Sequence, residues 1–413
     1  MTAAVVAAFT VTALLRVVGM PLTHSFGDFS RIDIDVYRLG AQLWRNGGSL
    51  YAAGSMPFTT DGIWLPFTYP PFAALSFLPF TVVPLVVAGA AIALATVAAT
   101  VVVSRIVVTR LRIGPVARRG TLALAVATAA LWTNPYWMTL GFGQVNVLLM
   151  LLVTVDLLVL PRDSRWRGTL IGVAAAIKLT PLAFVLFLIV RREWRATVRA
   201  IGVFVGLALL GLVWAPVDSV RYWSHTVFHT DRIGDLSGGI NQSVNGFWIR
   251  VLGWSGPAEQ VVWALSVIGL TVLAVVAVRQ CDRLGGDVLA VSVVAVWAVM
   301  VSPTSWAHHW VWAVPAIIAL TVVATRTDDV VVRRSYAALA GVGALVMVAG
   351  PFQFLPVHAS RWSVVDAVAG NAFCLWGLAV LVTIAVVGQA AGSDRSPGIA
   401  GAAPSGAFFR LAA

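Results

Sequence analysis

Long apolar runs, each close to the thickness of a bilayer's hydrocarbon core, recur along this chain of 413 residues. A run of about 20 apolar residues spans that core as an α-helix. Lipid offers no hydrogen-bond partners, so the backbone of each run must satisfy its own amides and carbonyls, as a helix does. The runs are predicted at residues 2–21, 65–83, 84–104, 120–138, 141–160, 169–190, 200–215, 260–278, 288–302, 311–325, 336–351 and 371–390.

The composition agrees with a chain that lies mostly in lipid. Hydrophobic residues make up 59% of the sequence and charged residues only 11%, whereas a soluble domain is about one-quarter charged. The period-two alternation typical of membrane barrel strands is absent. We therefore predict an all-α polytopic membrane protein with about 10–13 transmembrane or re-entrant helices. Residues 1–390 are expected to form one membrane-embedded domain, followed by a flexible cytoplasmic tail, 391–413.

The basic residues predict which loops share a face of the membrane. The net charge is +11, but these residues form no single patch, which argues against nucleic acid as a partner. Of the 28 basic residues, 19 fall in six segments: 105–119, 161–168, 191–199, 279–287, 326–335 and 391–413. The positive-inside rule places these segments and the N-terminus in the cytoplasm. The outer face then carries the following segments: loops 22–66, 216–250, 303–310 and 352–370, and a turn near 134–143.

One apolar run, 169–190, lies between two basic segments that belong on the same face. A single crossing would place 161–168 and 191–199 on opposite faces. Proline ends a helix at or before the preceding residue, and Pro181 interrupts this run. We therefore predict a re-entrant hairpin of two half-helices with Lys178, the only lysine, near its apex. A charge there costs about 3 kcal/mol, which favours a counter-ion for a lipid-linked phosphate; a snorkelling lysine is the alternative.

Titratable residues gather on the predicted outer face, which carries all six histidines. Such a gathering indicates a polar site, although outer loops also need polar residues for solvation. The acids of most interest there are Asp33 and Asp35. They would share one side of a strand but point about 200° apart on a helix, so they need not act as a pair. A single carboxylate suffices for a reaction that needs one general base.

Two adjacent histidines, His308 and His309, lie in a tryptophan-rich segment, 302–312. Tryptophan favours the membrane–water interface. Adjacent residues on a helix point about 100° apart, so the two rings are poor joint ligands for one metal. Metal-binding spacings such as H-E-x-x-H are also absent from the sequence. We therefore favour hydrogen bonding or phosphate binding for these histidines.

Two clusters of amide side chains lie at the ends of apolar runs. Gln144 and Asn146 belong to one, and Asn241 and Gln242 to the other. An amide both donates and accepts hydrogen bonds, which suits sugar hydroxyls. Helix capping is the alternative explanation. The 17 tryptophans do not decide the matter, because both sugar stacking and interfacial belts use tryptophan.

Seven short motifs occur in order along the chain. They are D-x-x-V-Y (33–37), G-x-x-Y (48–51), F-T-Y-P-P (67–71), G-Q-V-N (143–146), K-L-T-P (178–181), N-Q-S (241–243) and S-P-T-S-W-A-H-H-W (302–310). Together they resemble the actinobacterial glycosyltransferases of family 87, which have the C-type membrane fold. Members of this family use polyprenyl-phosphate sugars. They include the α-mannosyltransferases that extend phosphatidylinositol mannosides and lipomannan.

The resemblance implies a reaction at the outer face of the plasma membrane. Mannose would pass from polyprenyl-phosphate mannose to a lipid-linked mannoside, which is a phosphatidylinositol mannoside or lipomannan. The match to D-x-x-V-Y makes Asp33 the expected base, with Asp35 as the alternative. The expected stereochemistry is inversion, from a β-linked donor to an α-linked product.

The resemblance also implies which residues contact the substrates. Those expected at the donor phosphate are Lys178, His308, His309 and Arg31, with Arg361 behind them. Those expected at the sugar or acceptor are Tyr37, Tyr69, Gln144, Asn146, Asn241, Gln242 and Trp306. A lipid-phosphate donor carries no nucleotide diphosphate, so we expect neither a divalent metal nor another cofactor. The D-x-D spacing leaves metal binding as the alternative.

A transporter or flippase of lipid-linked sugar is the competing function. It would share the broken helix and the buried lysine. A flippase needs polar residues along its crossing path, whereas a transferase needs Asp33 or Asp35 beside the phosphate site on the outer face. The sequence does not choose the acceptor, the linkage, or mannose over arabinofuranose.

Overall fold

The computed structural model describes residues 2–18, 31–253, 256–284, 286–355 and 362–393. Within these ranges the regular secondary structure is helical, apart from one isolated β-bridge between Asn241 and Trp306. Five helices are long and apolar enough to cross a membrane, or seven if each of two bent pairs is one span. The prediction of an all-α polytopic membrane protein is thus confirmed for the described residues. Several predicted features lie outside them: His24, His358, Arg361 and residues 394–413.

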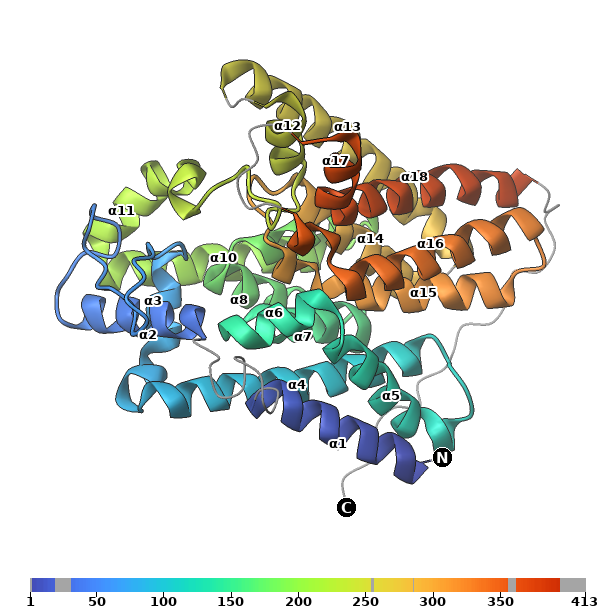
Figure 1. The fold of residues 1–413 in the computed structure, drawn as a ribbon, viewed down its shortest axis with the longest axis horizontal. Helices are drawn as coiled ribbons and strands as arrows, with labels where there is room; N and C mark the ends of the chain where they lie inside the picture. Colours follow the sequence, from blue (N-terminus) through green and yellow to red (C-terminus); the bar gives the residue numbers. More distant parts are fainter. Residues whose placement is uncertain (1, 19–30, 254–255, 285, 356–361, 394–413) are drawn as a thin grey trace.

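Most of the long helices run lengthwise in Figure 1. The five spans are α4 (Leu85–Arg110), α10 (Trp194–Trp214), α13 (Pro257–Leu284), α15 (Ala313–Arg326) with η7 (Ala307–Trp312) before it, and α16 (Val330–Ala349). One bent pair joins α6 (Asn134–Phe142) to α7 (Asn146–Thr154) and the π-helical η3 (Val155–Val159) at 117°. The other joins α17 (Val364–Gly370) to α18 (Ala372–Ser393) at 72°.

Shorter helices complete the described chain. The apolar ones are α1 (Thr2–Val18), α3 (Pro71–Phe77) with η1 (Leu78–Val82), η4 (Thr180–Phe184) with α9 (Val185–Val190), and α14 (Gly286–Val301). The others are α2 (Ile32–Arg45), α5 (Arg119–Leu131), α8 (Thr169–Ile177), α11 (Pro216–Ser224) and α12 (Val244–Leu252). Four further 3-10 turns are η2 (Val116–Arg118), η5 (Thr226–Phe228), η6 (Thr230–Ile233) and η8 (Pro351–Phe354).

Helix α14 lies in the core because it is apolar on every side. All its residues from Val288 to Val296 are buried, as expected for a helix without a polar face. Helix α10 instead exposes one apolar stripe that includes Leu209 and Val213. An exposed stripe of this kind is what a lipid-facing helix presents.

The segments predicted in the cytoplasm meet at one end of the molecule. The Arg162 guanidinium lies 3.7 Å from a carboxylate oxygen of Glu193 and 3.2 Å from one of Asp287. Arg326 donates to the backbone carbonyl of Leu111 at 2.6 Å. Arg162 thus joins three of the basic segments and Arg326 joins two others, and a small pocket lined by Arg110, Asp282 and Arg326 brings the two groups together. These five segments lie at one end of the molecule, and their place in the cytoplasm stays a prediction.

The broken apolar run folds as the predicted hairpin. Helix α8 ends just before Lys178, whose backbone is extended (φ −145°, ψ 127°), and η4 begins beside Pro181. At the other end of the hairpin, Arg167 and Glu193 form a buried ion pair of 2.6 Å. Both ends of the hairpin therefore lie on the basic face, and Lys178 lies at its apex.

Arg167 closes the base of this hairpin. Only 1% of the residue is exposed. Its guanidinium pairs with Glu193 and donates to three backbone carbonyls at 2.8–3.0 Å, those of Asp156, Leu157 and Leu160. Each buried donor thus has an acceptor, which is the condition under which a buried arginine is tolerated.

Two glycines allow α8 to lie directly against α10. A Cβ atom added at Gly168 would lie 2.2 Å from the carbonyl oxygen of Ala196. One added at Gly172 would lie 2.6 Å from the carbonyl oxygen of Ala200. Small residues four apart bring membrane helices into close contact in this way. The hairpin is therefore held both by its buried ion pair and by backbone packing.

The opposite end of the molecule is more helical than the sequence analysis predicted. Loop 22–66 contains α2, loop 216–250 contains α11 and α12, and the expected turn near 134–143 is α6. Helices α2, α3 and α11 gather at the left end of Figure 1. The sequence analysis named these segments only as outer loops and a turn, because their helices are short or amphipathic and lack the long apolar run by which spans were recognised.

Removal of the Arg167 side chain should destabilise the fold strongly. Arg167→Met leaves Glu193 and three carbonyls without their donor, and breaking a buried pair costs about 3–5 kcal/mol. Arg162→Met is the matched control, because the Arg162 side chain is 59% exposed and exposed pairs contribute less than about 1 kcal/mol. We expect a much lower thermal midpoint in detergent for Arg167→Met than for Arg162→Met. Equal midpoints would contradict a structural role for the buried pair.

Candidate functional site

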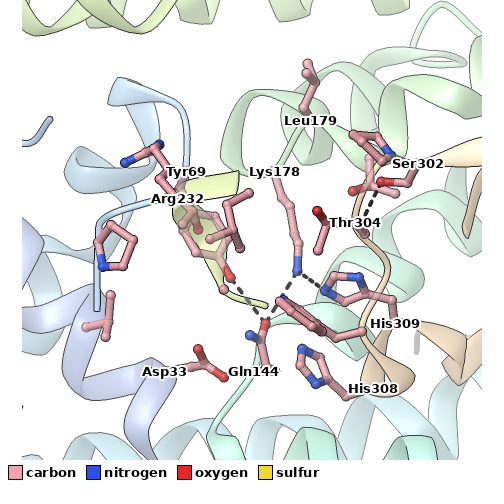
Figure 2. Close-up of a pocket in the computed structure, with 18 of the residues that line it drawn as sticks. Asp33, Tyr69, Gln144, Lys178, Leu179, Arg232, Ser302, Thr304, His308 and His309 are labelled. Atoms are coloured by element: carbon pink, nitrogen blue, oxygen red, sulfur yellow. Dashed lines mark hydrogen bonds between the residues drawn. The ribbon is translucent and has the colours of Figure 1, made fainter. Parts of the chain in front are cut away.

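A cavity of about 580 Å³ lies at the end of the molecule opposite the basic face. Segments far apart in the sequence line it, among them α2, the apex of the hairpin, η6 and residues 302–309 (Figure 2). Seven predicted site residues line the cavity: Asp33, Tyr69, Gln144, Lys178, Trp306, His308 and His309. Six are not among its lining residues: Arg31, Asp35, Tyr37, Asn146, Asn241 and Gln242.

The two aspartates of α2 point in different directions. Asp33 lines the cavity. Asp35 is buried elsewhere, where it accepts hydrogen bonds from the backbone N–H of Thr60 at 2.7 Å and from the Thr60 hydroxyl at 2.8 Å. Arg38 lies 3.5 Å from its other oxygen. This divergence follows from their spacing on a helix, and it leaves Asp33 as the carboxylate that a bound molecule can reach.

The surroundings of Asp33 tune its acidity. Burial raises its pKa to about 6, while a hydrogen bond from Gln144 and the positive charge of Lys178 oppose the rise. Asp33 also lies in the first turn of α2, where the helix dipole favours a negative charge. The carboxylate is therefore ionised at neutral pH yet basic enough to accept a proton, as a general base requires.

Lys178 is held by three polar groups from two other parts of the chain. Its Nζ lies 2.8 Å from Oδ1 of Asn146, 3.1 Å from Nε2 of His309 and 3.5 Å from Oε1 of Gln144. It also lies 5.5 Å from the centre of the Tyr69 ring. These contacts compensate the ammonium for the water that it loses on burial. Asn146 thus supports the cavity from outside, through Lys178 and through the backbone carbonyl of His308, to which its Nδ2 donates at 3.0 Å.

The two histidines have different environments. Lys178 is donor-only, so the contact with its Nζ makes Nε2 of His309 an acceptor and places the proton of that ring on Nδ1. Neither ring nitrogen of His308 has a hydrogen-bond partner within the described residues. The His308 ring packs edge-on against Phe142. Both histidines line the cavity, but only His309 is engaged with Lys178.

Gln144 connects the two sides of the cavity. Its Oε1 lies 2.8 Å from the hydroxyl of Tyr37 and 3.2 Å from that of Tyr69, and its side chain also hydrogen-bonds to Asp33. The sequence analysis gave Tyr37 a role in binding sugar, but the residue is fully buried behind Gln144. Figure 2 shows Gln144 between Asp33 and Lys178. The carboxylate and the ammonium are thus linked through one amide.

Asn241 and Gln242 hold the backbone together instead of facing the cavity. Both are fully buried. Asn241 accepts from the backbone N–H of Ser305 at 3.0 Å. Gln242 donates to the carbonyl of Gly370 at 2.6 Å and accepts from the N–H of Phe373 at 3.1 Å. Their geometry does not support the predicted contact with sugar, because these amide groups are occupied by backbone partners.

The arginine that lines the cavity is not the one that the sequence analysis named. Arg31 was expected at the donor phosphate, but its Nη2 donates to the carbonyl of Val17 at 2.5 Å, away from the cavity. Arg232 lines the cavity and was missed. Its Nη2 donates to the carbonyl of Phe67 at 2.9 Å. The signal was present in the sequence, because Arg232 lies on the face where the positive-inside rule leaves few basic residues.

Comparison with known proteins identifies a family and several relatives. The model of the family described as "Glycosyltransferase family 87" matches residues 67–303. A protein of Mycolicibacterium smegmatis, named as a polyprenol-phosphate-mannose-dependent alpha-(1-2)-phosphatidylinositol mannoside mannosyltransferase, is 39% identical over 86% of this chain and 84% of its own length. A protein of Mycobacterium tuberculosis, named as the corresponding pentamannoside mannosyltransferase, is 32% identical over 88% of this chain and 82% of its own.

A solved structure is also similar. The crystal structure of ArnT from Cupriavidus metallidurans, bound to undecaprenyl phosphate, aligns with 94% of this chain and 79% of its own. The sequence identity is 18% and the TM-score is 0.39. The sequence relatives, which are matched over more than four-fifths of both lengths, are therefore the informative comparison.

Replacement of Gln242 should reduce stability. Gln242→Leu leaves buried backbone groups of Gly370 and Phe373 without partners, each at a cost of about 1–3 kcal/mol. The matched control is Gln353→Leu, because Gln353 is exposed and bonds only to nearby carbonyls of its own segment. We expect a clear fall in the thermal midpoint for Gln242→Leu and little change for the control. An unchanged midpoint for Gln242→Leu would favour the predicted role in ligand binding.

Proposed function

The chain belongs to glycosyltransferase family 87, and we propose that it transfers mannose from polyprenyl-phosphate mannose to a mannosylated phosphatidylinositol. The single observation that carries the proposal is the cavity in which Gln144 links the carboxylate of Asp33 to the ammonium of Lys178. The names of the relatives, which are matched over most of their length, support this donor and this acceptor. They favour mannose over arabinofuranose and an α-(1-2) linkage. The C-type membrane fold expected from the motifs goes with the family.

Asp33 is the general base of the proposed reaction. Its carboxylate takes the proton of an acceptor hydroxyl as that oxygen forms a bond to the anomeric carbon of mannose. The bond between that carbon and the phosphate oxygen breaks, and polyprenyl phosphate leaves with the electron pair. One displacement of this kind converts a β-linked donor into an α-linked product. The proposal does not give this role to Asp35, because Asp35 bonds to Thr60 and does not line the cavity.

Lys178 stabilises the departing phosphate. Negative charge grows on the leaving oxygen, and a fixed cation in a site of low dielectric stabilises such charge effectively. The contact of Lys178 with Gln144 is the longest of its three, so a phosphate oxygen can replace that acceptor most easily. The leaving group is already an anionic phosphate, so the reaction needs no general acid. It needs no divalent metal or other cofactor, because the ammonium supplies the positive charge.

The wall beside Lys178 suits the lipid part of the donor. Leu179, Ala183, Ala298 and Val301 line the cavity there. An isoprenoid chain carries no polar groups. When it binds against apolar lining residues, it displaces water from them, which is favourable. In the proposed complex, the head group lies between Asp33 and Lys178 and the chain leaves along this wall towards lipid.

The cavity faces the outer side of the plasma membrane in the proposed topology. It lies at the end opposite the clustered basic segments, and the positive-inside rule places those segments in the cytoplasm. The acceptor and the head group of the donor would then meet in the outer leaflet.

The charged groups away from the cavity do not support a transporter. Asp156 accepts from the backbone N–H groups of Gly168 and Ile171, and Arg167 pairs with Glu193. These groups hold the base of the hairpin and do not form a polar path across the bilayer. A lipid-linked sugar is therefore the substrate of transfer in this proposal.

Replacement of the base should abolish transfer. We expect Asp33→Asn to lower kcat by about a hundredfold or more, the range typical of a lost general base. Asp35→Asn is the matched control, because its carbonyl oxygen can still accept from Thr60, and it should keep activity within a few-fold. The assay measures radiolabelled mannose moved from polyprenyl-phosphate mannose to extracted phosphatidylinositol mannosides by membranes that contain each variant. Normal transfer by Asp33→Asn would refute this base.

Transfer should continue in the presence of EDTA. The reason is that Lys178, rather than a metal ion, offsets the charge of the leaving phosphate. Lys178→Gln should lower kcat by about a hundredfold, as the loss of one transition-state donor does elsewhere. The same membrane assay is run with EDTA, without it, and with Mg²⁺ or Mn²⁺ restored. A loss in EDTA that either ion reverses would contradict the proposal.

A further inference from the structure

Three oxygen atoms form a closely spaced group behind the cavity, and they share two protons. The hydroxyl oxygens of Tyr37 and Tyr69 lie 2.7 Å apart, and they lie 2.8 Å and 3.2 Å from Oε1 of Gln144. Each phenol has one proton to donate, and the amide oxygen has none. Only two of the three contacts can be hydrogen bonds at one time. The two shortest give a directed chain in which Tyr69 donates to Tyr37 and Tyr37 donates to Gln144.

The contact with Lys178 identifies which atom of the Gln144 amide is the oxygen. An ammonium can only donate, so the Gln144 atom that lies 3.5 Å from Nζ is the oxygen. The NH₂ group of the same amide then points away from Lys178 and donates to Asp33, which as a carboxylate can only accept. A flipped amide would set its oxygen against the carboxylate and its NH₂ against the ammonium. The assignment of the two amide atoms therefore follows from their partners.

Tyr37 takes part in this chain without touching the cavity. It is fully buried and is not among the lining residues. Its ring stacks on Phe77 at a centroid distance of 4.3 Å and meets Tyr69 edge-on. Its hydroxyl is thus held by packing at the one point where it reaches Gln144. A substrate in the cavity would contact Gln144 and Tyr69, but not Tyr37.

We propose that Tyr37 is a positioning residue for the transfer reaction: its phenol proton holds the Gln144 amide in the orientation that aims its NH₂ at Asp33. The inference rests on the proposed function, in which Asp33 is the base. Hydrogen bonds in such a chain polarise one another, so the donation by Tyr37 strengthens the donation to the carboxylate. Tyr37 reaches the carboxylate through Gln144.

The pH dependence of transfer reports this role. Asp33 is active as a carboxylate, and its pKa is about 6, so kcat/KM should rise with pH through about 6 and fall below it. A weaker donor to a carboxylate raises its pKa. Loss of the Tyr37 proton should therefore move the acid limb to higher pH. The titratable and charged groups that line the cavity with Asp33 are Tyr69, Lys178, Tyr222, Arg232, His308 and His309, and each is unchanged in Tyr37→Phe.

The test is a pH profile of mannose transfer by Tyr37→Phe in membranes. We expect kcat/KM to fall about threefold at pH 8 and about eightfold at pH 5.5, with the acid limb about half a pH unit higher, as for one weakened hydrogen bond. The KM for the donor should not change, because Lys178 keeps its partners. The matched control is Tyr336→Phe, which removes a buried hydroxyl that has no partner within the described residues. That control should keep the wild-type limb.

A second variant separates positioning from a merely structural role. Gln144→Leu should move the acid limb upward as well, and Tyr37→Phe should have no further effect in its background, because Tyr37 acts through Gln144. A lower rate at every pH with the limb in place, in either single variant, overturns the inference. The inference is also overturned if Tyr37→Phe moves the acid limb of Gln144→Leu by as much as it moves that of the wild type. If Asp33→Asn is inactive and the acid limb of the pH profile stays in place in Tyr37→Phe, only this inference is overturned. If Asp33→Asn transfers mannose normally, the proposed base itself is overturned.

Discussion

The buried ammonium of Lys178 is the constraint on which the rest of the site depends. A charge at this depth must have its water replaced by protein groups. The replacements come from two places in the chain, namely Gln144 and Asn146 at the start of α7 and His309 in η7. Each of these segments departs from regular α-helix at that point, because side chains along a straight span cannot converge on one atom. The breaks in the helices thus bring these groups to one ammonium.

The hairpin that carries Lys178 is held in place by contacts at its base, the end opposite Lys178. Arg167 and Glu193 pair in a buried position, and Gly168 and Gly172 let α8 lie against the backbone of α10. These contacts fix the base of the hairpin against α10. In the proposed reaction, Lys178 must meet a phosphate, and it benefits from such support because positioning is a large part of catalysis. The buried pair of Arg167 and Glu193 therefore supports the segment that places Lys178 in the cavity.

Many features could be predicted from the sequence because they follow from local chemistry. Pro181 interrupts an apolar run between two basic segments, which requires a hairpin, and α8 and α9 form one. Asp33 and Asp35 are two residues apart, which on a helix sends them in different directions. The roles of Asn241 and Gln242 could not be predicted in the same way. An amide at the end of an apolar run suits a sugar or a backbone equally well, and only the position of Gly370 and Phe373 in space decides for the backbone.

By itself the sequence determined that the chain lies in a membrane, which of its segments share a face, and where its one buried lysine interrupts a helix. These properties depend on hydrophobicity, charge and proline, which act over a few neighbouring residues. The tertiary structure alone decided which aspartate reaches the cavity, that Arg232 rather than Arg31 lines it, and that Tyr37 stands behind Gln144. The reason is that each of these facts is a distance between residues far apart in the chain, and such distances are set by how the helices pack.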